Sequence, residues 1–240
     1  MKQSVKIFAH RGASGNALEN SFKAFEEAIT QKADGIEIDL QCSKDGQIFV
    51  FHDLNLKRLT GINRFIYDCI AEEIAEYHLG RRFFRMFSTL KIPTIEEMIA
   101  WNEKYQIPLN VELKETLLQN PTALIAWLKN VELPEGSHFS SFYPELLQIV
   151  KEIRPEFETA IIVNKSFNWN ELNQFTYADS IHAHKRYYNL KYLNVAANAG
   201  KKMRFYAITG DEDFIKNPHQ VVVGWITDYP QKLARAIGPK

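Results

Sequence analysis

The chain has 240 residues, of which 45% are hydrophobic, and its 29 basic and 29 acidic residues give a formal net charge of zero. This length and composition support a large core and are typical of a single α/β barrel domain, and the zero net charge argues against a broad nucleic-acid-binding surface. The two cysteines, Cys42 and Cys69, have no metal-type spacing and exclude a disulfide framework.

The amino-terminal sequence MKQSVKIFAHRG lacks the apolar stretch of a signal peptide. No run approaches the roughly 18 apolar residues of a membrane span. We therefore expect a soluble, cytoplasmic protein with no transmembrane segment and no nucleic-acid partner. The sequence leaves the oligomeric state open.

The first element is a short apolar run that ends at His10 and Arg11. A loop follows, and apolar residues at helical spacing over 22–29 predict a helix capped by Ser21 or Asn20. His10 and Arg11 then lie at the carboxyl end of a strand, where βα-barrel enzymes place their chemistry. Such a pair often only anchors a loop, but a guanidinium that binds phosphate oxygens and an imidazole that moves a proton also suit a phosphate ester.

The next stretch predicts a hairpin. Glu37 and Asp39 alternate with apolar residues, so both acids project from the same face of a strand. A turn at 44–46 leads into a second strand over 47–51, and the connection is too short for a parallel crossover. A turn centred on Asp45 and Gly46 makes residues whose numbers add up to about 91 face each other, which sets Asp39 opposite His52.

Residues 54–91 show an irregular pattern rich in charged and aromatic residues. We interpret this region as an insertion over the barrel mouth, with a short helix at 71–77. Its basic and aromatic run at 81–87 is compatible with a lid, a subunit contact or a membrane-surface patch.

An alternation of strands and helices resumes after Pro93. Thr94 and Glu97 form a capping-box pattern that opens a helix over 95–105. The strand at 109–113 brings Glu112 and Lys114 to one face. Further strands are predicted at 137–142, 159–163, 179–184, 204–208 and 224–228. Eight strands remain when the return strand of the hairpin is excluded. Helix-length segments separate these strands, except before the last one. This pattern predicts a (βα)8 TIM barrel with a small insertion after the second strand.

Barrel closure brings the polar ends of the first three barrel strands together, because adjacent strands lie about 4.8 Å apart. The three carboxylates of Glu37, Asp39 and Glu112 suggest a site for one hard divalent cation, Mg²⁺ or Ca²⁺, and zinc is less favoured. His10 and His52 flank this site, where they are placed to act as acid and base on opposite sides of a phosphorus atom.

Seven fragments in this order resemble the motifs of the glycerophosphodiester phosphodiesterase family. They are His10-Arg11-Gly12, Glu19-Asn20-Ser21, Gly35-Ile36-Glu37-Ile38-Asp39, Asp45-Gly46 through His52-Asp53, Glu112-Leu113-Lys114, Ser140-Ser141-Phe142 and Ile226-Thr227-Asp228-Tyr229-Pro230. Each fragment is weak alone, but the ordered set spans almost the whole chain.

The resemblance implies a single TIM-barrel phosphodiesterase domain over residues 1–240, with 54–91 as the insertion. It implies hydrolysis of small glycerophosphodiester substrates to glycerol 3-phosphate and an alcohol. It also implies that His10 and His52 are the catalytic acid and base and that Arg11 and Lys114 contact the phosphate. Glu37, Asp39 and Glu112 would hold the metal.

Other residues have less certain roles. Glu19 either caps the first helix or orients Arg11, and the motif favours the second role. Phe142, Tyr206 and Trp225 are candidate pocket walls, although such aromatic residues more often only pack. His182 and His184 share a strand face and either line the barrel or are satisfied core histidines.

Two alternatives remain open at this point. The same barrel would suit a lysophospholipase D-like phosphodiesterase acting on lipids, or a catalytically silent protein that binds phosphodiesters. The run Arg204-Phe205-Tyr206-Ala207-Ile208-Thr209 departs from the usual family pattern, which makes the substrate preference less transferable than the chemistry.

Overall fold

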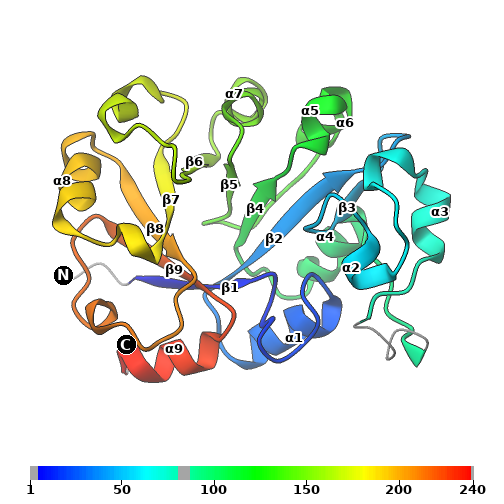
Figure 1. Ribbon diagram of the computed structural model, residues 1–240, viewed down its shortest axis with the longest axis horizontal. Helices are drawn as coiled ribbons and strands as arrows, with labels where there is room; N and C mark the ends of the chain where they lie inside the picture. The colour runs from blue at the N-terminus through cyan, green and yellow to red at the C-terminus, as the bar shows by residue number, and fades with distance from the viewer. Residues whose placement is uncertain (1–4, 81–86, 239–240) are drawn as a thin grey trace.

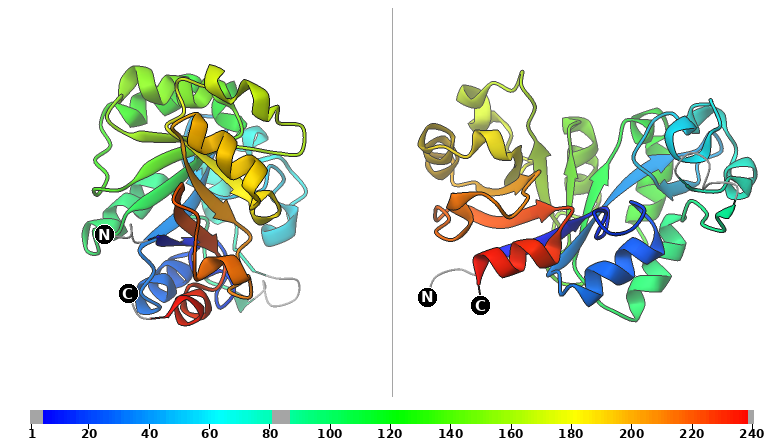
Figure 2. Two further views of the ribbon diagram at one scale, coloured as in Figure 1. Left: turned by 90° about the vertical axis from the view of Figure 1, so that its left-hand side faces the viewer. Right: turned by 60° about the horizontal axis from the view of Figure 1, so that its bottom comes forward.

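The computed structural model describes residues 5–80 and 87–238, which form one closed parallel barrel with an extra strand outside it (Figures 1 and 2). The barrel strands follow the order β1-β9-β8-β7-β6-β5-β4-β2, and β1 pairs with β2 to close the ring. β3 pairs antiparallel with β2. The strands are β1 (Lys6–His10), β2 (Gly35–Cys42), β3 (Ile48–Val50), β4 (Leu109–Leu113), β5 (His138–Ser141), β6 (Glu158–Ile162), β7 (Ser180–His184), β8 (Lys202–Tyr206) and β9 (Val222–Thr227).

Helices surround the barrel, which confirms the predicted (βα)8 architecture (Figure 2). The α-helices are α1 (Phe22–Thr30), α2 (Lys57–Thr60), α3 (Ala71–Glu76), α4 (Ile95–Glu103), α5 (Thr116–Gln119), α6 (Pro121–Leu128), α7 (Pro144–Ile153), α8 (Leu190–Asn198) and α9 (Pro230–Ile237). The 3₁₀ turns are η1 (Ile66–Asp68), η3 (Trp169–Gln174), η4 (Lys185–Tyr187) and η5 (Asp213–Ile215). Ser21 caps α1, and Thr94 and Glu97 form the predicted capping box of α4.

Two crossovers differ from the regular pattern. The connection from β6 to β7 contains only the 3₁₀ turn η3, and the connection from β8 to β9 contains only η5. The second difference is consistent with the sequence, because 211–223 is short for a helix. The first could not be predicted from the sequence, because the segment there has the length of a helix but folds as turns.

The hairpin exists, but its predicted register is wrong by one residue. Leu40 pairs with Val50 and Cys42 with Ile48, so paired residue numbers add up to 90. The turn is longer than assumed, because the backbone N–H of Ser43 donates to the carbonyl oxygen of Gln47 at 2.9 Å. Asp39 consequently lies opposite Phe51, and His52 lies one residue beyond the pairing.

The inside of the barrel is polar at its centre. His182 on β7 is 1% exposed, and its ring packs edge-to-face on His138 of β5, with the ring centroids 5.3 Å apart. Arg204 on β8 is also buried, and it donates hydrogen bonds to Glu158 and Ser180. His182 is therefore a core histidine inside the barrel.

The insertion packs around its own small core. Apolar side chains of β3, α2, η1 and α3 meet in one buried cluster: Phe49, Phe51, Leu56, Leu59, Ile66, Cys69, Ile74, Leu79 and Ile92. The predicted helix at 71–77 is α3. Residues 81–86 of the basic and aromatic run lie outside the described residues. Within 5–80 and 87–238, the structure contains no helix long and apolar enough to cross a bilayer.

Candidate active site

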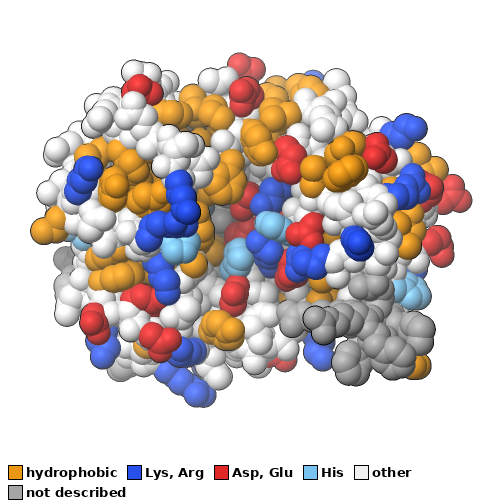
Figure 3. Space-filling model, viewed as in Figure 1, with side chains coloured by type: hydrophobic (Ala, Val, Ile, Leu, Met, Phe, Trp, Pro, Cys, Tyr) orange, Lys and Arg blue, Asp and Glu red, His pale blue; other side chains and the backbone are white. Residues whose placement is uncertain are grey.

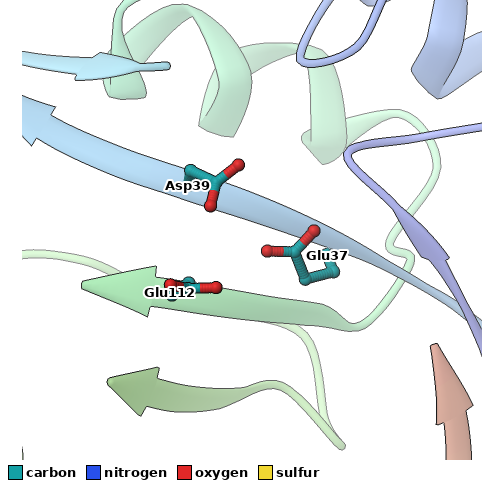
Figure 4. A group of neighbouring side chains, drawn as sticks. All are labelled: Glu37, Asp39 and Glu112. Carbon is teal, nitrogen blue, oxygen red and sulfur yellow. The ribbon is translucent and has the colours of Figure 1, made fainter. Parts of the chain in front are cut away.

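Three carboxylates meet at the carboxyl end of two neighbouring strands. Glu37 and Asp39 project from β2 and Glu112 from β4, and each offers an oxygen within 4.8 Å of the others (Figure 4). The parallel register sets Asp39 beside Glu112. Because alternate residues of a strand share a face, the predicted cluster follows directly from this pairing.

Two cations offset the negative charge of this cluster. The Nζ atom of Lys114 lies 2.9 Å from Oδ1 of Asp39 and donates a short hydrogen bond to Glu112. The Nε atom of Arg11 lies 3.1 Å from Oδ2 of Asp39. Burial alone would raise the pKa of Asp39, but Lys114 and Arg11 outweigh it and hold that pKa well below its usual range.

Glu37 has one oxygen that neither a hydrogen bond nor an ion pair satisfies among the residues described. Its Oε2 accepts a hydrogen bond from the backbone N–H of Arg11 at 2.8 Å, whereas its buried Oε1 has no hydrogen-bond partner among the residues described. Burial, and then the neighbouring charge of Asp39, raise the pKa of Glu37 to about 8. A buried carboxylate oxygen without a partner, beside two further carboxylates, fits a hard divalent cation that takes oxygen ligands.

The first candidate histidine is held by a carboxylate from the far end of the chain. The Nδ1 atom of His10 lies 2.7 Å from Oδ1 of Asp228, which also accepts a hydrogen bond from Ser14. A carboxylate only accepts, so Nδ1 carries a proton and Nε2 points toward the carboxylates, 4.0 Å from Oε2 of Glu37. Burial opposes protonation of His10, but Asp228 and then Glu37 outweigh it and raise its pKa.

The second candidate histidine has the same arrangement. The Nδ1 atom of His52 lies 2.8 Å from Oδ1 of Asp53. Arg58 of α2 then binds Asp53, with Nε 2.5 Å from Oδ2. The same guanidinium makes two hydrogen bonds to Glu19, at 2.6 and 2.8 Å.

Glu19 joins this group to the cluster, because its Oε1 accepts from Nη1 of Arg11 at 2.8 Å. The contact expected between Glu19 and Arg11 is therefore present. A continuous chain of hydrogen bonds and ion pairs, which we call the ion-pair chain, runs from His52 to Asp39 through Asp53, Arg58, Glu19 and Arg11.

A tight turn after β1 aims Arg11 at the cluster. Arg11 has φ 57° and Gly12 has φ 80°, both in the left-handed region that favours glycine. A Cβ on Gly12 would lie 2.6 Å from the backbone carbon of Ala24 in α1. Glycine is therefore required at position 12 for the chain to turn against α1, and this turn presents the N–H of Arg11 to Glu37.

The three aromatic candidates have different surroundings. Tyr206 ends β8 and is half-buried, with its ring 5.4 Å from that of His184, and Phe142 follows β5 and is exposed. Trp225 does not reach the mouth. It is fully buried and packs on Phe205 and Phe214 in the layer outside the barrel.

The placement of Trp225 follows from strand alternation. A Cβ on Gly224 would touch the side chain of Arg204 inside the barrel, so the next residue of β9 faces outward. The prediction that Trp225 lines the pocket is therefore wrong.

Sequence reasoning gave no role to Asp228, Asp53 or Arg58. Asp228 and Asp53 lie in fragments that resemble the family motifs. Their carboxylates could have been proposed as hydrogen-bond partners of the two histidines. No sequence pattern indicated a role for Arg58, because its contacts depend on how the insertion folds.

On the face shown in Figure 3, acidic, basic and histidine side chains gather around a central hollow. Two other cavities are separate from the site: a groove of about 830 Å³ between α4 and α6, and a hollow of about 550 Å³ that Lys6, Phe8 and Arg204 help to line. Neither cavity is lined by the three carboxylates, by the two candidate histidines or by the side chains that bind them.

Comparison with known families agrees with this geometry. Residues 10–232 match the model of the Glycerophosphoryl diester phosphodiesterase family. The chain belongs to this family. The prediction that the protein is a phosphodiesterase is thereby confirmed, and members of this family are generally dependent on a divalent metal.

Individual family members are similar over nearly the whole chain. An uncharacterised protein of Bacillus subtilis is 30% identical over 240 residues, covering 96% of this chain and 97% of its own. A glycerophosphodiester phosphodiesterase of Bacillus altitudinis is 28% identical with the same coverage. Among solved structures, an Oleispira antarctica phosphodiesterase in complex with the product sn-glycerol-3-phosphate has a TM-score of 0.84 at 30% identity, covering 97% of this chain and 96% of that one.

Proposed function

We propose that this protein hydrolyses glycerophosphodiesters to glycerol 3-phosphate and an alcohol, using one divalent cation, Mg²⁺ or Ca²⁺. The observation that carries the proposal is a buried cluster of three carboxylates next to two histidines, each with Nδ1 on a carboxylate. The similar structure that was solved with sn-glycerol-3-phosphate supports the product.

Glu37, Asp39 and Glu112 would hold the cation, which would supply Lewis-acid stabilisation of charge on the phosphate oxygens. Arg11 and Lys114 are the cations of the chain placed to bind the same oxygens. Glu19 positions Arg11 for this contact.

His10 and His52 divide the proton transfers between them. One takes a proton from the attacking hydroxyl, which belongs either to water or to the glycerol 2-hydroxyl of the substrate. In the second case a cyclic phosphate forms first, and attack by water then opens it to glycerol 3-phosphate. The other gives a proton to the alcohol oxygen as its bond to phosphorus breaks. Asp228 and Asp53 fix the tautomer of each ring, so that Nε2 is the atom that exchanges the proton.

The test is release of glycerol 3-phosphate from glycerophosphocholine and glycerophosphoethanolamine, measured with EDTA and after addition of Mg²⁺ or Ca²⁺. We expect loss of release with EDTA and recovery with one of the two cations. His10→Ala and His52→Ala should each abolish turnover with little change in the unfolding midpoint. His78→Ala, at an exposed histidine of the insertion, is the matched control and should retain activity.

Undiminished release in EDTA after exhaustive metal removal would contradict the metal assignment, and near-normal activity of both active-site variants would contradict the histidine assignment. Binding of the diesters without release would instead fit the silent binding protein. The lysophospholipase D alternative is not favoured, because the Bacillus altitudinis relative, which covers 96% of the chain, is a glycerophosphodiester phosphodiesterase.

A further inference from the structure

The side of the barrel mouth formed by β7 and β8 carries hydrogen-bond donors that the proposed chemistry does not use. His184 and Tyr206 end these two strands and are paired in register. Two residues below them, His182 and Arg204 are paired in the same way and face the barrel interior. Alternation therefore directs His184 and Tyr206 into the mouth.

Arg186 completes this donor wall, which we define as His184, Arg186 and Tyr206. Its side chain is exposed and lies over the ring of Tyr187, with 5.7 Å from Cζ to the ring centroid. In the part of the chain that the structure describes, no carboxylate forms an ion pair with Arg186. Its charge is thus available to a ligand.

His184 acts as a neutral donor in this wall. Its Nδ1 accepts a hydrogen bond from the backbone N–H of Arg186 at 3.1 Å, so the proton of the neutral ring is on Nε2. Burial, followed by the charges of Arg186 and Lys185, lowers the pKa of His184, which keeps the ring neutral at pH 7.

Glu212, an acid beside the wall, is already neutralised. Glu212 pairs with Lys185 at 2.6 Å and accepts hydrogen bonds from the backbone N–H groups of Thr209 and Gly210. Its negative charge is therefore balanced, and the wall keeps the positive charge of Arg186.

The wall faces the same space as the carboxylate cluster. Burial has the largest effect on the Tyr206 hydroxyl and raises its pKa. The charge of Arg186 lowers this pKa, and the charge of Glu112 raises it. Tyr206 thus lies within electrostatic range of both a proposed metal ligand and the free guanidinium. In the closed strand order of the barrel, β7 and β8 lie across the mouth from β2 and β4, which carry the cluster.

We infer that the donor wall is a subsite for the leaving alcohol, and that it selects glycerophosphodiesters whose alcohol carries a second negatively charged group, a carboxylate or a phosphate. This inference rests on the proposed function. A quaternary ammonium group such as that of choline finds no anionic partner at this wall and is repelled by Arg186.

The test uses two substrates that differ by one carboxylate, glycerophosphoserine and glycerophosphoethanolamine. We expect kcat/KM to be about 10-fold higher for the serine diester. One charge-assisted hydrogen bond from Arg186 to the carboxylate accounts for a difference of this size. The ratio of the two values should fall about 10-fold in Arg186→Gln. Arg235→Gln, at an exposed arginine in the last turn of α9, is the matched control and should keep the parent ratio.

Ionic strength gives a second readout, because added salt screens an exposed charge and should reduce the serine preference of the parent protein but not of Arg186→Gln. Equal kcat/KM values for the two diesters in the parent, or an unchanged ratio in Arg186→Gln, would overturn the subsite and leave the proposed function standing. Release from neither diester would overturn both.

Discussion

The orientation of each candidate catalytic histidine depends on a single carboxylate. Asp228 accepts from Nδ1 of His10, so the ring presents Nε2 to the site in one tautomer. Without this partner the ring could exchange tautomers or turn away from Glu37. Asp228 therefore acts through His10 and has the role of a positioning residue.

Replacing Asp228 by Asn tests this role. The amide can offer an N–H to Nδ1, which moves the ring proton to Nε2, and we expect kcat to fall at least about 100-fold while KM changes little. Glycerol 3-phosphate release measures the effect. Asp211→Asn is the control, since Asp211 is exposed and pairs with Lys232 on the surface. Equal kcat values for both variants and the parent would remove Asp228 from the site.

At the level of elements, the short helix α2 connects the insertion to the barrel chemistry. Arg58 binds Asp53 and Glu19 at once, and these two acids hold His52 and Arg11. The ion-pair chain therefore gives the insertion a positioning role.

We expect Arg58→Gln to lower kcat/KM by about 10- to 100-fold, because both His52 and Arg11 lose an orienting partner. Arg58→Lys should recover part of the loss but not all, since an ammonium cannot bind both acids in the bidentate manner of a guanidinium. Arg64→Gln is the matched control, because Arg64 lies in the same insertion and, among the described residues, its side chain binds only Glu73, Tyr77 and a backbone carbonyl. Equal losses in Arg58→Gln and Arg64→Gln would show that the insertion matters only for stability.

Elements were easier to predict than their exact register. Alternation identified the strands and brought Glu37, Asp39 and Glu112 to one face, because side-chain period is a local property. The hairpin register depended on hydrogen bonds of Ser43 inside the turn, which the residue types alone do not specify. The prediction for Trp225 failed for the same reason. An error of one residue in the start of a strand exchanges the side chains that face the barrel interior with those that face outward.

Contacts between distant segments were beyond sequence reasoning. Asp228 and His10 are 218 positions apart, and only closure of the barrel between β1 and β9 brings them together. Arg58 needs the fold of the insertion as well. The sequence motifs identified the segments that carry the proposed catalytic residues. They did not show which residues of those segments are in contact.

For the whole molecule, the polar barrel interior makes stability depend on pH. Burial first, and then the positive charge of Arg204, hold the pKa of His138 well below 6.5. Burial, the His138 ring and Arg204, in that order, do the same for the pKa of His182. Glu158 lies near this pair, but it is engaged by Arg204 and Ser180. Both rings are therefore neutral in the folded state.

In the unfolded chain these rings titrate near pH 6.5, so below that pH the unfolded state binds more protons than the folded state. The free energy of unfolding should then fall as pH decreases, by up to about 1.4 kcal/mol per pH unit for each histidine. Urea unfolding at pH 7, 6 and 5 measures this slope.

His182→Met removes one of the two rings. It should reduce the slope of unfolding free energy against pH by the contribution of one histidine, about 1.4 kcal/mol per pH unit. His78→Gln, at an exposed position, should leave the slope unchanged. Glu37 contributes with the opposite sign, because its raised pKa favours the folded state as pH falls from about 8. It is present in every variant and cancels in the comparison. An unchanged slope in His182→Met would mean that the ring is protonated in the folded protein.

The pairing of β2 with β3 fixes the geometry of the insertion relative to the barrel. β2 carries Glu37 and Asp39 and continues directly into the antiparallel ladder, where the N–H of Phe51 donates to the carbonyl oxygen of Asp39 at 2.9 Å. His52 thus directly follows a residue whose backbone is hydrogen-bonded to a barrel strand. These backbone hydrogen bonds hold the start of the insertion against the barrel, so the rest of its sequence can diversify to reshape substrate entry while the spacing between His52 and the carboxylates stays constant.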